Sequence, residues 1–209
     1  MSGPTIIVTG TDTDIGKTVF AAALAGALDA SYWKPVQAGM EGGGDALAVA
    51  TLSGLPPAQI LPEAYRLQTP CSPHRAAEID GVEIEIDRLT LPAIHGPLII
   101  EGAGGVLVPV TRDLLFADLF ARWGQAVVLV ARTRLGTINH SLLSIEALRS
   151  RGVPILGIAF VGDAVEDSEA TIASIGDVRR LGRLPHLEKL DAGTLQAAFL
   201  ENFDVEDFR

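Results

Sequence analysis

The sequence contains little cysteine and little positive charge, and each shortage excludes particular structural features or partners. Cys71 is the only cysteine among 209 residues, so no disulfide can form within the chain. Lys and Arg number 16 against 26 Asp and Glu, which gives a formal net charge of −10 and a pI of about 4.8. A surface with that balance repels nucleic acid and anionic membranes, so we expect neither as a partner.

Long apolar runs and targeting patterns are also missing. No apolar stretch reaches the roughly 20 residues that cross a bilayer, and the N-terminus has no basic–apolar signal pattern. We therefore expect a cytosolic protein. Hydrophobic residues still make up 48% of the chain, which argues for a folded protein and against disorder. A chain of this length is expected to form one domain, residues 1–209, with a substantial core.

What the sequence does contain is a glycine-rich turn, GTDTDIGKT, at residues 10–18. An apolar β-branched run precedes it and an alanine-rich segment follows, which predicts strand, loop and helix. Glycines at both ends let the backbone wrap closely around a phosphate that also faces the positive end of the helix. Lys17 is placed to reach the β- and γ-phosphates, and the Thr18 hydroxyl to ligate Mg²⁺. Five residues rather than the usual four separate the first glycine from the Gly-Lys pair, so this is a variant P-loop.

Predicted strands and helices alternate along the rest of the chain. Such alternation requires crossover connections, which predicts an α/β fold with a mostly parallel sheet and helices on both faces. The predicted strands are Thr5–Gly10, Tyr32–Val36, Pro97–Gly102, Ala126–Ala131, Pro154–Val161 and Arg180–Leu184. The predicted helices are Val19–Leu28, Ala46–Leu52, Arg75–Glu78, Asp87–Ile94, Phe116–Trp123, Ile138–Arg151, Glu166–Ile175 and Thr194–Leu200. Between them, Gln37–Gly44 predicts a flexible connection and Gly54–Ser72 an irregular excursion.

Charged residues follow several predicted strands directly. Ligands of a parallel α/β sheet sit at the carboxyl ends of its strands, so Lys17, Lys34, Glu101 and Arg132 are expected along one rim. Lys34 would be a second cation for the charge that develops in phosphoryl transfer. Taken alone, Lys34 fits a solvated lysine better than a site residue.

A hydroxyl and two carboxylates are predicted near the glycine loop. Thr18, Asp45 and Glu101 together supply the oxygen ligands that Mg²⁺ prefers. Each carboxylate has a plainer alternative when it is considered alone. Glu101 would be a strand-end acid facing water, and Asp45 a helix cap.

Several motifs occur in an order that resembles the dethiobiotin synthetase family of the biotin pathway. A glycine loop alone is shared by many NTPases, but the ordered set is specific, and the five-residue loop spacing is itself the family's form. The resemblance covers nearly the whole chain to about Leu187. The motifs after the glycine loop are KPVQAG at 34–39, DAL at 45–47, SPH at 72–74, EGAGG at 101–105 and LGTINH at 135–140.

This resemblance implies a P-loop NTPase fold and an ATP-dependent ring closure. The substrate 7,8-diaminononanoate would take up CO₂ or bicarbonate as a carbamate on one amine. The carbamate oxygen would attack the γ-phosphate, and the other amine would close the ureido ring and expel phosphate. Lys17 and Lys34 are implied as catalytic residues, and Mg²⁺ would be held by Thr18, Asp45 and Glu101.

The resemblance also implies two sets of binding residues and a homodimer, with the substrate site at the subunit interface. For the nucleotide the implied residues are Asp14, Ile15, Gly16, Lys17, Thr18, Val19, Asp45, Glu101, Gly102, Ala103, Gly104, Gly162, Asp163, Leu184, Pro185 and His186. For the substrate they are Thr13, Lys34, Ala38 and Gly104, with Leu135, Gly136, Thr137, Ile138 and Asn139 from the partner subunit.

Two positions depart from the family pattern. Ala38 stands where the family often has Ser or Thr, so one hydroxyl contact to the substrate is missing. Gly162-Asp163 stands where some members carry Asn-Asp and read adenine with the Asn. An Asn amide offers a donor and an acceptor, whereas glycine has no side chain. We therefore expect weak discrimination among nucleobases.

Two other classes of P-loop protein are alternatives. ParA- and MinD-like switch ATPases typically carry an additional lysine early in the loop, but positions 11–15 here read TDTDI. The last nine residues are acidic, unlike a basic membrane-targeting helix. The amidating enzymes of corrin biosynthesis usually add a glutaminase domain with a nucleophilic cysteine, for which 209 residues leave no room.

Overall fold

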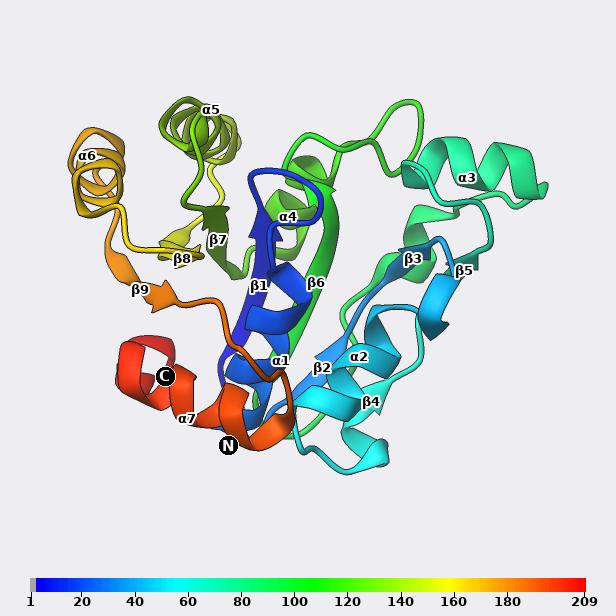
Figure 1. Ribbon diagram of the computed structural model, residues 1–209. Coiled ribbons are helices and arrows are strands. Elements are labelled where there is room, and N and C mark those ends of the chain that lie inside the picture. Colours follow the sequence, from blue (N-terminus) through cyan, green and yellow to red (C-terminus); the bar gives the residue numbers. More distant parts are fainter. Residues whose placement is uncertain (1–2) are drawn as a thin grey trace.

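The computed structural model describes residues 3–209, and its strands form one large sheet and one small one (Figure 1). The strands are β1 (Thr5–Gly10), β2 (Ser31–Trp33), β3 (Val36–Ala38), β4 (Ile60–Leu61), β5 (Tyr65–Leu67), β6 (Leu98–Gly105), β7 (Ala126–Arg132), β8 (Ile155–Val161) and β9 (Arg180–Leu184). Seven of them pair in the order β4-β2-β6-β1-β7-β8-β9, and β3 pairs with β5. All of these pairings are parallel, which confirms the predicted sheet.

Helices cover both faces of the large sheet, as the alternation predicts (Figure 1). They are α1 (Lys17–Leu28), α2 (Asp45–Leu52), α3 (Pro73–Asp80), α4 (Phe116–Trp123), α5 (Thr137–Arg149), α6 (Glu166–Gly176) and α7 (Ala192–Asn202). One core lies under α1, α2 and α7, and the other under α3, α4, α5 and α6. Within residues 3–209 no helix has both the length and the apolar character to cross a membrane.

The two cores follow from the period of two in a strand. In β1, Ile6 and Val8 pack toward α1, while Ile7 between them packs toward the opposite face. In β7, Val128 and Leu129 divide between the two faces in the same way. Because helices cover both faces, the central residues of these strands, Ile6–Val8 and Val127–Ala131, are all apolar and do not alternate with polar residues.

The C-terminal segment packs onto the first helix of the chain. Phe199 and Phe203 of α7 and the following turn stack with ring centroids 4.6 Å apart. Phe20 of α1 lies 5.5 Å from the Phe203 ring and 6.3 Å from Phe208, all buried. This cluster fixes α1, and with it the loop from which α1 starts.

The structure corrects the prediction between residues 37 and 96. The predicted helix Asp87–Ile94 is wrong: only a 3₁₀ turn forms, Ile86–Leu89, because Pro92 pushes the residue before it out of the helical region. The predicted irregular excursion contains β4 and β5. The predicted strand Tyr32–Val36 is divided into β2 and β3 at Lys34 and Pro35. The predicted flexible connection Gln37–Gly44 is anchored at its start, since Gln37 and Ala38 of β3 pair with Arg66 and Leu67 of β5. These strands are two or three residues long, too short for a recognisable period.

Candidate active site

The glycine loop joins β1 to α1 in a backbone conformation that only its sequence allows. Gly16 has φ +92° at the N-cap of α1, and a Cβ there would lie 2.8 Å from Val161. A Cβ at Gly10 would lie 2.6 Å from the Ile15 side chain. No side chain caps α1, so its first N–H groups stay available to an anion.

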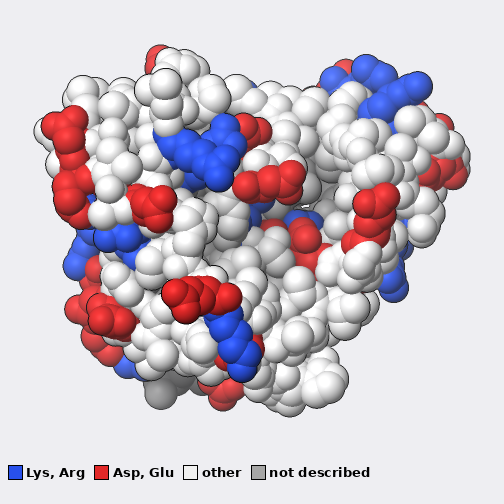
Figure 2. All heavy atoms as spheres, viewed as in Figure 1, with Lys and Arg blue, Asp and Glu red and all other residues white. Residues whose placement is uncertain are grey.

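A central cavity of about 770 Å³ opens beside this loop. Figure 2 shows a hollow in the middle of this face of the molecule, with charged side chains around it. Residues 13–19 of the loop form one wall, and residues 70–73 before α3 lie on another. The predicted site residues that line it are Thr13, Asp14, Ile15, Gly16, Lys17, Thr18, Val19, Lys34, Ala38, Asp45, Glu101, Ala103 and Gly104.

Lys34 lies between the two predicted carboxylates. Its Nζ is 3.1 Å from Glu101 Oε1 and also forms an ion pair with Asp45. Burial by itself would lower the pKa of Lys34, but the facing carboxylates of Glu101 and Asp45 outweigh it and raise the pKa above its ordinary value. Lys34 as a whole residue is 3% exposed, and its ammonium stays charged. The interpretation as a solvated lysine is therefore excluded.

Glu101 is fully buried and accepts hydrogen bonds on both oxygens. Thr18 Oγ1 donates to Oε1 at 2.8 Å, and the Tyr32 hydroxyl donates to Oε2 at 2.8 Å. The carboxylate is 0% exposed, so it is no acid facing water. Nor does it end its strand, because β6 continues to Gly105, which pairs with Gly10 of β1.

Tyr32 is a site residue that sequence reasoning missed. It lies within an apolar strand, and its contact with Glu101 spans 69 positions of the sequence. Burial and the negative charge of Glu101 raise the pKa of the Tyr32 phenol well above its ordinary value. The hydroxyl is therefore a neutral donor at every ordinary pH.

Asp45 begins α2 but does not cap it. Gly44 occupies the N-cap with φ +81°, and Asp45 is the first helical residue, so the predicted role as a helix cap is wrong. Gln37, also missed, holds this helix start: its Oε1 accepts from Asp45 N at 3.0 Å. The Gln37 Nε2 donates to Gly39 O at 3.0 Å, and the side chain is buried.

Lys17 points back into its own loop. Its Nζ donates to the Asp12 carbonyl at 2.7 Å, and the side chain is 7% exposed. Burial lowers the pKa of Lys17 to about 8, with Glu101 opposing that shift and the neighbouring Lys34 adding to it. A triphosphate in the loop would have to exchange this carbonyl for its own oxygens.

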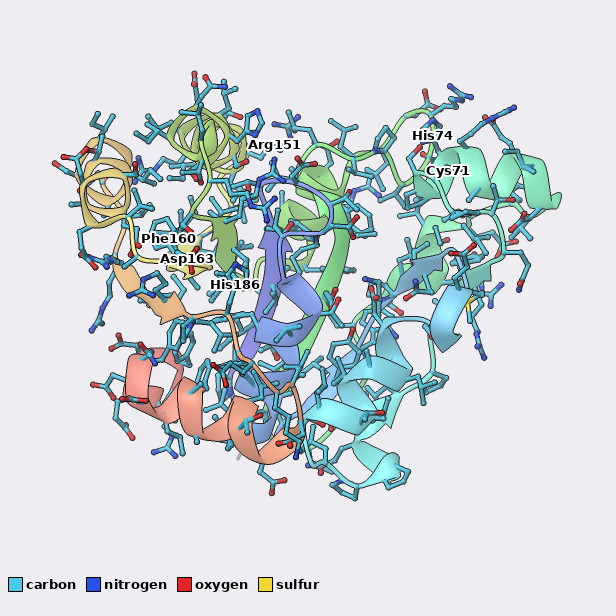
Figure 3. The ribbon with its side chains drawn as sticks, in the orientation of Figure 1. Cys71, His74, Arg151, Phe160, Asp163 and His186 are labelled. Atoms are coloured by element: carbon cyan, nitrogen blue, oxygen red, sulfur yellow. The ribbon has the colours of Figure 1, made fainter. Side chains whose placement is uncertain are left out.

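A lateral cavity of about 440 Å³ adjoins the central one and shares Asp14, Ile15 and Gly16 of the glycine loop and Val19 of α1 with it. The predicted residues Gly162, Asp163, Leu184, Pro185 and His186 line it. Figure 3 shows Asp163 and His186 near the end of β8 and after β9, with Cys71 and His74 across the molecule at α3. Arg132 lines this lateral cavity, and its Nη2 lies 3.5 Å from Asp12 Oδ2. The four charged residues predicted along one rim are therefore divided between two cavities.

Gly162 occupies a position that admits no other residue easily. Its φ is +128°, and a Cβ would lie 2.5 Å from Thr133 Oγ1. Its N–H donates to Leu184 O at 3.0 Å, and its carbonyl accepts from Arg183 Nη1 at 3.3 Å. Gly162 therefore has no side chain to offer a base, its N–H is already used, and its carbonyl already accepts one hydrogen bond.

Six predicted residues line neither cavity. Gly102 is buried in β6, where a Cβ would lie 2.9 Å from Phe120. The others form the loop at the start of α5: Leu135, Gly136, Thr137, Ile138 and Asn139. Leu135 is fully exposed, whereas the Thr137 hydroxyl is buried without a hydrogen-bond partner.

Comparison with curated proteins gives relatives that match along the whole chain. Residues 4–194 match the family described as an AAA domain. The ATP-dependent dethiobiotin synthetase BioD of Rhodopseudomonas palustris strain BisB18 is 67% identical, covering 98% of both chains. The synthetase of the same name from Novosphingobium aromaticivorans is 66% identical over 97% of this chain and 98% of its own. That of Rhizorhabdus wittichii is 65% identical over 97% of each.

Solved structures resemble the chain in fold at much lower identity. A ParA family ATPase from Chlorobium tepidum superposes with a TM-score of 0.55 at 15% identity, covering 98% of this chain and 92% of its own. The cell division ATPase MinD of Pyrococcus furiosus gives 0.52 at 14% identity, covering 97% and 90%. At such identities the likeness shows the P-loop fold alone and does not support a switch function.

Proposed function

The chain belongs to the dethiobiotin synthetase family, and from this premise we propose that its central cavity joins ATP, CO₂ and 7,8-diaminononanoate into dethiobiotin. One observation carries the proposal. Two lysines, two carboxylates and a hydroxyl line one cavity beside the glycine loop, and no side chain caps the helix that starts from this loop. That arrangement suits the transfer of a phosphoryl group to an anionic acceptor.

The reaction needs three steps. One amine of the substrate adds to CO₂ and loses a proton, which gives a carbamate. A carbamate oxygen attacks the γ-phosphorus and ADP leaves, which gives a carbamic–phosphoric anhydride. The second amine attacks the same carbonyl carbon, phosphate leaves, and the ureido ring is closed.

The two lysines would act on the charge shared by the carbamate and the γ-phosphate. Lys34 is held rigidly by Glu101 and Asp45, so it would face the substrate without reorganising. Lys17 would leave the Asp12 carbonyl for the phosphates. Thr13, Ala38 and Gly104 line the same cavity and would contact the substrate, with only a methyl group at position 38.

Thr18, Asp45 and Glu101 fit a magnesium site by their chemistry. All three offer oxygen, and Lys34 lies within ion-pair distance of both carboxylates, so the three groups are close together. Among residues 3–209 no cluster of three His, Cys, Asp or Glu competes with this set. When bound, Mg²⁺ would neutralise phosphate charge.

We also propose that the enzyme is a homodimer in which Leu135–Asn139 of one subunit reaches the substrate of the other. This loop lines neither cavity of its own subunit, yet it opens a helix whose N-terminal end attracts a carboxylate. An apolar groove of about 440 Å³ runs beside α5, and Leu107 and Leu143 on it are about half exposed. Leucines exposed in this way support an interface here, because a second subunit would remove them from water.

The nucleobase would occupy the lateral cavity, where Gly162 offers it no side chain. The side chains of Asp163 and His186 and the backbone of 184–186 remain. A Gly162→Asn variant would not test this cleanly, because the Asn Cβ would lie too close to Thr133. The backbone conformation at this position would also be strained for any residue other than glycine. Location in the cytosol and the absence of nucleic-acid or membrane partners stay predictions from the sequence.

The test measures phosphate release and dethiobiotin formation together. Both should require ATP, Mg²⁺, bicarbonate and 7,8-diaminononanoate, in a ratio of one phosphate to one dethiobiotin. A switch ATPase would release phosphate without the diamine, and such release at an undiminished rate would contradict the proposal. Lys34→Gln protein serves as the blank, since it keeps the loop and loses the second cation.

A further inference from the structure

The two oxygens of Glu101 have different surroundings. Oε1 faces the cavity and accepts from Thr18 and Lys34, at 2.8 and 3.1 Å. Oε2 faces the interior of the protein, where the Tyr32 hydroxyl donates to it at 2.8 Å. Glu101 and Tyr32 are both 0% exposed, so bulk water cannot replace this donor.

Tyr32 itself is held on every side. It lies on β2 and pairs across to Ile99 of β6, two residues before Glu101 and therefore on the same face of the sheet. Its ring belongs to the core beneath α1 and α2, with Ile99 and Val49. The hydroxyl thus has a fixed position, and it fixes the plane of the carboxylate.

We propose that Tyr32 is a positioning residue that turns Glu101 so that Oε1 alone is offered to the metal of the reaction. The proposal rests on the function proposed above and adds a residue from outside its motifs. Groups that hold a metal ligand from behind commonly change metal affinity by about 10- to 100-fold when removed. Without the hydroxyl, Oε2 would lack a donor in a site closed to water, and the carboxylate would rotate toward Thr18 or Lys34.

The chain supplies a matched control in its only other tyrosine. Tyr65 is also buried, and its hydroxyl bonds the backbone of Glu85 at 2.8 and 3.3 Å, outside the cavity. Tyr65→Phe therefore deletes a buried, hydrogen-bonded hydroxyl without touching Glu101. Tyr32→Phe deletes the corresponding hydroxyl next to Glu101.

The experiment titrates Mn²⁺ into protein with ADP and follows free Mn²⁺ by electron paramagnetic resonance, with Mg²⁺ and ADP calorimetry as a second reading. Thermal melting of each variant without metal reports folding. We expect Tyr32→Phe to raise the Mn²⁺ Kd at least about tenfold, and Tyr65→Phe to leave it within about twofold. Glu101→Gln, which alters the proposed metal ligand itself, should weaken Mn²⁺ binding at least as much as Tyr32→Phe.

The outcomes separate this inference from the function it rests on. A Tyr32→Phe Kd within twofold of the unmodified protein, beside a weakened Glu101→Gln, would overturn the positioning role and leave the metal site intact. Unchanged affinity in both variants would remove Glu101 from the metal site and overturn the inference with it. Equal weakening by the two Phe variants would mean that a general loss of stability, and not the position of Glu101, moves the affinity.

Discussion

Replacing Lys34 by glutamine removes the cation that the carboxylates of Asp45 and Glu101 both face. If Lys34 stabilises charge in the transition state, turnover at saturating substrates should fall at least ~10²-fold, the scale of a lost charge-stabilising donor. The amide keeps most of the length of the side chain and some of its donors. Loss of turnover would therefore report the charge more than the packing.

The same change should destabilise the protein without metal. Removing one partner of a buried ion pair costs about 3–5 kcal/mol. The lower end applies here, because the Asp45 side chain is 33% exposed and Thr18 and Tyr32 still donate to Glu101. About 3 kcal/mol corresponds to a fall in Tm of about 6–12 °C for a chain of this size. Saturating Mg²⁺ should restore part of the Tm, since it brings positive charge back to the carboxylates.

The assay combines phosphate release at 20 °C, where the variant is folded by circular dichroism, with thermal melting in EDTA and in Mg²⁺. Lys189→Gln is the control, because that lysine is 79% exposed and an ion pair as exposed as the one with Asp191 contributes little to stability. Turnover by folded Lys34→Gln within tenfold of the unmodified protein would refute the transition-state role. An unchanged Tm in EDTA would refute the ion-pair reasoning.

Three further predictions follow from the site. Mixing inactive Lys34→Gln with an Asn139→Ala variant should restore part of the activity through hybrid dimers, and a fully active monomer by light scattering would exclude a shared site. CTP, GTP and UTP should give kcat/KM within about tenfold of ATP, because the missing Asn contact at Gly162 is worth roughly 1–3 kcal/mol by analogy with base reading in DNA; an ATP preference above ~10³-fold would show that other groups read the base. Burial lowers the pKa of Lys17 to about 8, so the free protein loses this positive charge as the pH rises through 8. The Kd for ADP in EDTA should then rise about tenfold per pH unit above that point, whereas an affinity that stays flat to pH 9.5 would mean that Lys17 keeps its proton.

Several features were predictable because each depends on residues close in sequence. The glycine loop needs Gly10, Gly16, Lys17 and Thr18 within nine positions, and the strand before it and the helix after it follow from local periodicity. Parallel pairing followed from alternation, since strands joined by helices cannot pair as hairpins. Lys34 and Glu101 were predicted as site residues because the sequence placed each at the end of an apolar strand. Lys34 does follow β2 directly, whereas β6 continues past Glu101 to Gly105.

The partners of those residues were decided only by the tertiary structure. Tyr32 reaches Glu101 because β2 pairs with β6, and no local pattern marks a tyrosine within an apolar strand as polar in function. Gln37 holds Asp45 through a turn that the sequence presented as a flexible glycine run. Such contacts join residues that are distant in sequence or separated by irregular backbone, and the geometry of the completed sheet is what brings them within hydrogen-bond distance. The local sequence therefore predicted most of the groups of the candidate site, and the fold determined how each is held.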